Sequence, residues 1–354
     1  MQPYAPVLER TRGTRAESLH YAAAALVDSS GKLLAWIGNP RQDTFLRSSA
    51  KPFQAMPFIE QGYARDLGLL PRQISQICAS HGGTDMHAEA VRGIQEKIDI
   101  DESFLQCGSH PPLDKETNET LIRRGEKPTS IRHNCSGKHT GMLAFAKMRG
   151  LPLDNYLDPE HPIQKDILTT FSEMCKFSID KIGTGTDGCS APNFSIPLYN
   201  TALGFARLCD PQKLPEKRAD ACKTITSAMM AHPEMVSGFG RFDTRLMQIG
   251  RGKLVAKTGA EGYQAVGILP GLTEAPFRAQ ASPKGVGIAL KISDGDPKEA
   301  VRAAVMIEIL RQFGILNKDE LAELADEFGP VTEIFNWRKI KVGEAHPVFE
   351  LERV

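Results

Sequence analysis

The chain has 354 residues, of which 41% are hydrophobic and 24% are charged, as in globular proteins large enough to bury a core. Lys and Arg (43) balance Asp and Glu (43), and this zero net charge argues against a nucleic-acid surface or a polybasic membrane anchor. No run approaches the ~18 apolar residues of a membrane span, and residues 1–20 lack an apolar signal-peptide core. The cysteine count of seven is odd, which favours reduced thiols over a disulfide framework. We therefore expect a cytoplasmic protein with small-molecule partners.

The first half of the chain predicts a β-hairpin followed by helices. Residues 20–37 form two short apolar segments joined by the turn cluster at residues 28–31, which predicts two antiparallel strands. A helix is expected from Ser48 to about Gly62, and Pro57 should kink it or end it early. Further helices are expected at residues 71–78, 85–98 and 113–124, and in the second part of 131–148.

The second half continues with helices and then changes to strands. Helices are expected at residues 163–177, 199–209 and 215–230, whereas the glycine-rich stretch 182–194 cannot stay regular for long. Three strands are expected at residues 253–257, 263–268 and 286–292. Helices follow at 297–314, with Asp296 as the expected N-cap, and at 318–328.

This order predicts an α+β fold, because strands gather at both chain ends and helices fill the middle. We expect one antiparallel sheet formed by both ends, with an inserted helical lobe. We expect residues 1–354 to form a single catalytic domain. Its sheet lobe would comprise about residues 1–43 and 250–354, and its helical lobe about residues 44–249.

Ser48 and Lys51 have the Ser-x-x-Lys spacing, which places them one turn apart on one face of a helix. A serine hydroxyl needs a neighbouring base to attack, and a lysine can serve where burial or a second cation lowers its pKa. Ser49 is only two residues from Lys51 and would point elsewhere. Taken alone, the spacing favours a helix start over a catalytic pair, since serine is a common N-cap and Pro52 is tolerated in a first turn.

The triplet Lys257-Thr258-Gly259 ends an expected strand. Together with Ser-x-x-Lys it supplies two of the three elements of serine β-lactamases and penicillin-binding proteins, while the third, Ser-Asp-Asn, is absent. Ser80, which follows a short helix, could pair with Lys257 as a second Ser–Lys couple. Without the other motifs, a helix-terminal serine and a strand-ending turn would be the simpler interpretations.

Two cysteines lie in loops rich in Gly and Ser, Cys135 in HNCSGKH and Cys189 in TDGCSAP. Thiolates bind Zn²⁺ well, but a zinc site needs three or four ligands. The neighbouring candidates are His133, Lys138, His139 and Asp187. Because no Cys-x-x-Cys pair occurs, the residues alone favour the interpretation of these cysteines as small apolar residues.

Arg241 lies in a polar loop, GRFDT, after Gly238. Its guanidinium could hold a substrate carboxylate through two parallel hydrogen bonds. A surface ion pair with Asp243 explains the same residues as well.

Six motifs taken together, LRSSAKP, CASHGG, HNCSGKH, TDGCSAP, GRFDT and AKTG, resemble the rhizobial-type (asparaginase II) L-asparaginases, from about Ser18 to Gly295. That family in turn resembles serine β-lactamases, penicillin-binding proteins and serine-dependent glutaminases in fold. The resemblance implies L-asparagine hydrolysis to L-aspartate and ammonia, a zinc ion and a homodimer.

Residue by residue, the resemblance implies two Ser–Lys couples, with Ser48 as nucleophile. The implied catalytic residues are Ser48, Lys51, Ser80 and Lys257. The implied zinc ligands are Cys135, Lys138 and Cys189. The implied substrate-binding residues are Arg47, Ser49, His139, Asp187 and Arg241. A zinc-bound lysine must be neutral.

Other functions stay open at this point. A glutaminase would need a pocket deeper by one methylene group, and no residue in the sequence indicates the depth of the substrate pocket. A penicillin-type amidohydrolase would share the motifs. Zinc-activated water could replace Ser48 in a metalloamidase, or the cysteines could hold a structural zinc in a ligand-binding protein.

Overall fold

The alanine-rich segment at residues 22–27 lies in the buried half of strand β2 (Arg15–Asp28) in the computed structural model, which describes residues 2–271, 284–297 and 299–353. The chain folds as two units. The sheet unit comprises Met1–Leu46, Ile196–Asp210 and Leu246–Val354, and the helical unit comprises Arg47–Ser195 and Pro211–Arg245.

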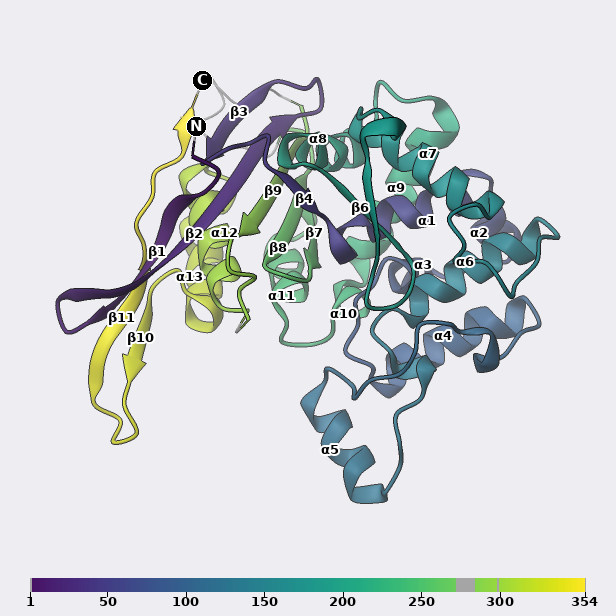
Figure 1. Cartoon of the computed structure of the whole chain (residues 1–354), viewed down its shortest axis with the longest axis horizontal. Coiled ribbons are helices and arrows are strands. Elements are labelled where there is room, and N and C mark those ends of the chain that lie inside the picture. The colour runs from purple at the N-terminus through teal and green to yellow at the C-terminus, as the bar shows by residue number, and fades with distance from the viewer. Residues whose placement is uncertain (1, 272–283, 298, 354) are drawn as a thin grey trace. The chain divides into compact units, whose positions relative to one another are not determined.

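The sheet unit carries an antiparallel sheet in the order β10-β11-β1-β2-β9-β8-β7, with β3 also on β2 and β12 on β3. Strands from the two chain ends lie side by side, since β1 pairs with β11 through Leu8 and Pro347 (Figure 1). This arrangement agrees with the α+β class, whereas the likeness to β-lactamases stays a prediction. The strands are β1 (Ala5–Arg12), β2, β3 (Leu33–Ile37), β7 (Leu254–Gly259), β8 (Tyr263–Ile268), β9 (Val286–Ile292), β10 (Thr332–Phe335), β11 (Lys341–Pro347) and β12 (Glu352–Arg353).

Helix α8 (Leu198–Cys209) packs on β2, β8 and β9, and this contact places residues 196–210 in the sheet unit. The helix approaches the sheet closely at two glycines. A Cβ at Gly287 would lie 1.8 Å from the Ala202 carbonyl oxygen, and one at Gly267 would lie 2.6 Å from Cys209 Sγ. The sequence alone had assigned this stretch to the helical lobe, because helical periodicity does not reveal which layer a helix covers.

The sheet unit also holds α12 (Val301–Gln312) and α13 (Lys318–Phe328). The N-cap of α12 is Ala300, not Asp296 as expected. Asp296 nevertheless serves this helix end, because its buried carboxylate accepts hydrogen bonds from the backbone N–H groups of residues 300–302. Strand β4 (Asp43–Phe45) belongs to the sheet unit, whereas the boundary between the two units falls within α11 (Phe242–Ile249).

The helical unit begins with a short 3₁₀ helix, η1 (Arg47–Ala50), which runs into α1 (Lys51–Glu60). Pro57 lies inside α1, and the helix continues for three residues beyond it. The glycine-rich stretch expected to be irregular instead forms the hairpin strands β5 (Gly183–Thr186) and β6 (Pro192–Pro197).

Six further helices of this unit follow the expected segments closely. They are α3 (Pro71–Ile77), α4 (Asp85–Lys97), α5 (Lys115–Arg124), α6 (Ser136–Met148), α7 (Pro162–Cys175) and α9 (Glu216–Ala231). Five short helices match no expected segment, namely α2 (Tyr63–Asp66), η2 (Glu102–Phe104), η3 (Ser130–Arg132), η4 (Ile179–Lys181) and α10 (Pro233–Val236). Among the described residues, every helix is too short or too polar to cross a membrane.

Helix α6 lies very close to α3. A Cβ at Gly137 would lie 2.1 Å from the Gln76 carbonyl oxygen, and one at Gly141 would lie 2.5 Å from Ile77 Cγ2. These two glycines are four residues apart and therefore share one helix face. Their lack of side chains sets the start of α6 directly beside the end of α3, after which Ser80 follows.

Candidate active site

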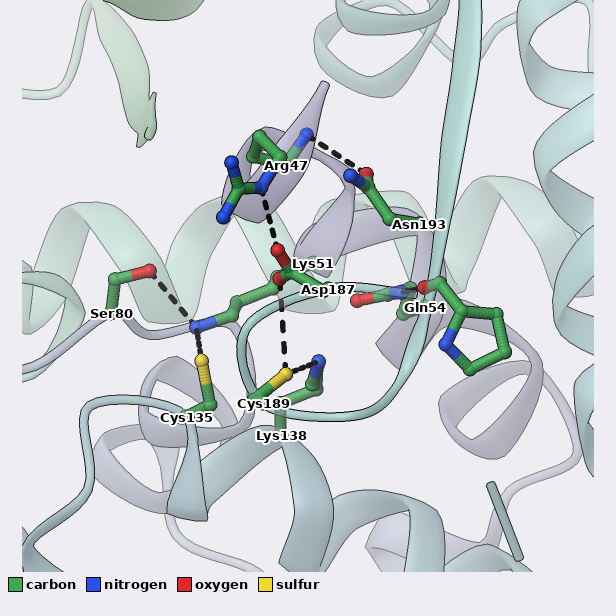
Figure 2. A network of polar contacts seen from close by, with 10 residues as sticks. Arg47, Lys51, Gln54, Ser80, Cys135, Lys138, Asp187, Cys189 and Asn193 are labelled. Carbon is green, nitrogen blue, oxygen red and sulfur yellow. Dashed lines mark hydrogen bonds and ion pairs between the residues drawn. The ribbon is translucent and has the colours of Figure 1, made fainter. Parts of the chain in front are cut away.

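Lys51 is the first residue of α1, and its side chain is almost completely buried, with 1% of its surface exposed. Its ammonium group donates to Ser80 Oγ at 2.9 Å and contacts Cys135 Sγ at 3.2 Å (Figure 2). It also donates to the carbonyl oxygens of Ala79 and, at 3.5 Å, Asn134. Burying a charge is costly unless it is paired and hydrogen-bonded, and these contacts supply the partners.

Ser48 lies in η1 and is half-buried. Within the described residues, no hydrogen bond joins Ser48 Oγ to Lys51 Nζ, although the spacing predicts that the two can touch. An ammonium has three protons to donate, and the groups of Ala79, Ser80, Asn134 and Cys135 surround that of Lys51. Lys51 therefore engages Ser80 in this structure, a contact that depends on the packing of α1 against α3 and α6.

Arg47, directly before Ser48, has a left-handed backbone with φ of 52°. Its N–H donates to Asn193 Oδ1 at 3.1 Å, which holds this conformation from strand β6. Residues in sparsely populated backbone regions persist where the surroundings enforce them, and they often cluster at active sites. The turn that presents Ser48 is thus fixed from a strand far away in sequence.

Cys135 is the residue before α6, Lys138 lies in its first turn, and Cys189 lies in the loop between β5 and β6. All three side chains are buried. Lys138 Nζ is 2.9 Å from Cys189 Sγ, and Figure 2 shows both sulfur atoms beside the lysines. The fold therefore brings together the three residues that the resemblance names as metal ligands.

The two cysteine sulfur atoms each contact the side-chain nitrogen of a buried lysine, Cys135 that of Lys51 and Cys189 that of Lys138. The neighbouring Cys189 side chain, followed by Lys51 and Lys138, lowers the pKa of Cys135 well below its ordinary value. For Lys138, burial works toward a lower pKa, but the two cysteines and Asp187 outweigh it and raise the pKa. A thiolate and an ammonium thus stabilise each other here.

Asp187 and Arg47 form an ion pair, with 2.6 Å between Asp187 Oδ1 and Arg47 Nε. The Asp187 side chain is 11% exposed and the Arg47 side chain 26%. Burial alone would raise the pKa of Asp187, but Lys138 and Arg47 together lower it. The pair offers a carboxylate for an ammonium group and guanidinium N–H groups for a carboxylate.

His139 is fully buried, and its Nδ1 lies 2.6 Å from the Tyr156 hydroxyl. Its Nε2 has no hydrogen-bond partner among the described residues. Burial lowers the pKa of His139 to about 4, while the nearby Cys189 side chain opposes that shift. A neutral imidazole nitrogen is therefore left facing the sulfur cluster.

The other predicted site residues come from η1, the residue before α11, and strand β7. Lys257 lies on β7 in the sheet unit, is fully buried, and donates to the Thr258 carbonyl oxygen at 2.8 Å. Arg241 is half-buried just before α11, and Ser49 is fully buried in η1. The Ser80–Lys257 couple and the substrate-binding roles of Ser49 and Arg241 stay predictions.

The donor chemistry of the cluster fits zinc. Two thiols and an amine are ligands that Zn²⁺ accepts, and three protein ligands leave a fourth tetrahedral position open. Among the described residues, no three His, Cys, Asp or Glu side chains form a metal-binding group, so a zinc site here needs Lys138. Lys138 would have to release its proton on metal binding.

Several groups that shape this site carried no signal in the sequence. The carbonyl groups of Ala79 and Asn134 hold Lys51, Asn193 holds the Arg47 backbone, and Tyr156 orients His139. Backbone carbonyls have no residue signature. Tyr156 lies outside every motif that sequence analysis singled out.

Comparison with known proteins identifies a family. The sequence model of one family, described as L-asparaginase II, matches residues 8–347. The match covers nearly the whole chain and includes each predicted site residue, from Arg47 to Lys257. Comparison with curated proteins returns no match.

Proposed function

The chain belongs to the L-asparaginase II family, and from this premise we propose that it hydrolyses L-asparagine through a Ser–Lys acyl-enzyme route with a zinc ion nearby. The family itself makes the protein an amidohydrolase acting on a small molecule. The observation that carries the proposed route is the buried Lys51 ammonium, 2.9 Å from Ser80 Oγ and three residues after Ser48.

Acylation begins at Ser48. Its Oγ attacks the side-chain amide carbon of asparagine while the neutral form of Lys51 accepts the hydroxyl proton. The C–N bond then breaks, and the proton is returned to the nitrogen, which leaves as ammonia. Because Ser80 Oγ is hydrogen-bonded to Lys51 Nζ, Ser80 can pass the proton along this line. Backbone N–H groups, including that of Ser48, stabilise the oxyanion.

Deacylation reverses these roles. Water attacks the Ser48 ester and loses its proton to Lys51, aspartate leaves, and the proton returns to Ser48 Oγ. Two hydroxyl groups and one lysine therefore serve both halves of the reaction.

Asp187 and Arg47 orient the substrate in this proposal. The Asp187 carboxylate accepts hydrogen bonds from the substrate α-ammonium group, and Arg47 holds the α-carboxylate. The ion pair between them, with 2.6 Å from Arg47 Nε to Asp187 Oδ1, keeps both side chains in place before substrate binds. The orphaned His139 Nε2 lies in the same group of side chains and is a further polar contact for a ligand.

Zinc would be held by Cys135, Lys138 and Cys189, and when bound it would supply a Lewis-acid charge that orients polar groups of the substrate. The chain's own residues carry out the proton transfers. In this proposal the serine attacks the amide and metal-bound water does not.

The test is ammonia release from L-asparagine and L-glutamine, measured side by side with zinc content, for wild type and Ser48→Ala. We expect release from asparagine well above glutamine, and its loss in Ser48→Ala with zinc content unchanged. Ser227→Ala, an exposed serine on α9, is the matched control. Turnover retained by Ser48→Ala would contradict the assignment, and preference for glutamine would change the substrate while keeping the route.

A metalloamidase is the second candidate, and the two buried thiols beside Lys138 favour it. There, zinc-bound water would attack the amide and Ser48 would be structural. Activity that survives in Ser48→Ala but disappears completely on chelation would support this candidate.

A further inference from the structure

His81 follows Ser80 directly and is completely buried. Its Nδ1 accepts a hydrogen bond from the Gly83 N–H at 3.1 Å, so the proton of the neutral ring is on Nε2. Nε2 then donates to Ser136 Oγ at 3.0 Å, and Ser136 Oγ donates to the Ile131 carbonyl oxygen at 2.7 Å. The tautomer and the direction of this chain of bonds are thereby fixed.

The same imidazole joins two segments that are distant in sequence. The His81 N–H donates to the Asn134 carbonyl oxygen at 3.2 Å, and its ring reaches Ser136 one residue after Cys135. Lys51 spans the same gap, because its ammonium contacts Ser80 Oγ on one segment and Cys135 Sγ on the other (Figure 2). His81 and Lys51 are therefore parallel cross-links between the Ser80 segment and the Cys135 segment.

We propose that His81 is a positioning residue, which fixes the separation between Ser80 Oγ and Cys135 Sγ and so holds Lys51 Nζ in place for proton transfer. This inference rests on the proposed Ser–Lys route. His81 itself exchanges no proton with substrate, because both ring nitrogens are engaged, one by Gly83 and the other by Ser136.

Small displacements matter at such a site. A shift of about 1 Å in a catalytic group can lower the rate on the order of a hundredfold. The Lys51 contacts of 2.9 Å and 3.2 Å leave little room for the two segments to move apart. Loss of the ring bond to Ser136 would remove one of the links between the two segments at the point where Lys51 contacts both, and would leave the His81 N–H bond to the Asn134 carbonyl.

The experiment compares two substitutions at His81 with one at His87. His81→Asn keeps a polar atom near the Nδ1 position but is too short to reach Ser136, whereas His81→Gln extends an amide donor toward the Nε2 position. His87→Asn is the matched control, because His87 is also buried and its ring stacks on the His81 ring, with 4.9 Å between the two ring centroids. Its hydrogen bonds go to Thr84 and Glu234 instead of the Cys135 segment.

We expect kcat for L-asparagine to fall on the order of tenfold to a hundredfold in His81→Asn, with KM changed less than threefold or so. His81→Gln should recover most of that loss, and His87→Asn should keep kcat near the wild-type value. Melting temperature and zinc content are measured for each variant. A purely structural role would lower the melting temperature of His81→Asn and His87→Asn alike and leave kcat of the folded protein unchanged.

Ser136→Ala provides a second route should His81→Asn fail to fold. It removes the acceptor of the Nε2–H bond and should lower kcat in the same direction, and in the double variant the two effects should not multiply. Equal kcat in His81→Asn and His87→Asn, or multiplicative losses in the double variant, would overturn the role of His81. Absence of ammonia release from the wild-type protein would overturn the proposed function as well, so the two failures are distinguishable.

Discussion

Asp296 in the sheet unit and Lys51 in the helical unit are both buried charges, but they are satisfied in opposite ways. Asp296 accepts hydrogen bonds from three backbone N–H groups four to six residues away, all at the start of one helix. Lys51 reaches side chains and carbonyls 28 to 84 residues away, on segments that α1 does not adjoin in sequence. Asp296 binds the start of one helix, whereas Lys51 links several segments of the chain.

This difference separates a structural polar group from a functional one. A locally satisfied carboxylate stabilises its own helix whatever the rest of the chain does. A charged group whose partners come from distant segments makes its hydrogen bonds only in the folded state, and these bonds place reactive groups next to each other. The comparison can be tested by removing buried groups of each kind, as follows.

The largest effect is expected for Lys51→Met. Loss of the side-chain amine leaves Ser48 without its base and removes a link between the Ser80 and Cys135 segments. We expect turnover to fall by about 10³-fold or more. Steady-state ammonia release measures it, with Lys147→Met at an exposed position of α6 as the control. A loss below about tenfold would remove Lys51 from the chemistry.

Metal removal should come next. Chelation should lower turnover by at least about tenfold, since the substrate loses a fixed positive charge, and zinc addition should restore it. Cys189→Ser should lower zinc content, whereas Cys222→Ser, at a buried position on α9 outside the cluster, should not. Unchanged zinc content in Cys189→Ser would show that the sulfur cluster is not the metal site.

Asp187→Asn tests the ion pair with Arg47. The neutral amide cannot balance the substrate α-ammonium, so KM for L-asparagine should rise about tenfold or more while kcat changes less. Asp326→Asn, an exposed carboxylate on α13, is the control. An unchanged KM would mean that Asp187 serves the sulfur cluster alone.

The buried histidines predict acid sensitivity. Burial lowers the pKa of His87 below its ordinary value of 6.5, so the folded state binds fewer protons than the unfolded state. Its contribution to stability is complete above pH about 6.5 and is lost as the pH falls further, by ~1.4 kcal/mol for each unit of pKa lowering. In His87→Asn the free energy of unfolding should fall less steeply below pH 6.5, as urea titrations at several pH values can show. An unchanged slope would contradict this.

The smallest effect is expected for Asp296→Ala. Removing the carboxylate that serves the start of α12 should lower the free energy of unfolding by about 1 kcal/mol, with kcat unchanged. Asp319→Ala, at an exposed position in the first turn of α13, should lower it by only a few tenths through the helix dipole. If Asp296→Ala lowered kcat tenfold, local satisfaction of a charge would be no guide to its role.

Sequence patterns predicted helices and strands well where the hydrophobic periodicity or the helix caps were strong. They predicted poorly those strands that form because they pair with another strand. Helix α13 spans the predicted residues 318–328, and β8 and β9 also have the predicted bounds. Strands β1, β10 and β11 were missed, because their short sequences become strands by pairing: β1 pairs with β2 and β11, and β11 pairs with β10.

The same distinction applies to the site. Motifs identified Ser48, Lys51, Cys135, Lys138 and Cys189, and the fold brings the last four together with Ser80. The spacing predicts that Ser48 and Lys51 can touch on one helix face, but Ser48 lies in η1 and Lys51 begins α1. The actual partner, Ser80, depends on how α1, α3 and α6 pack, and no local pattern encodes that.

The most direct test of the account is to identify the acylated residue. Wild-type protein is mixed with excess L-asparagine, quenched in acid within milliseconds, digested and mapped by mass spectrometry. We expect an added aspartyl group on the peptide that contains Ser48, absent from Ser48→Ala. An aspartyl group on Ser80 would make the residue bonded to Lys51 the nucleophile, and no adduct under any quench time, with turnover intact, would contradict the acyl-enzyme route.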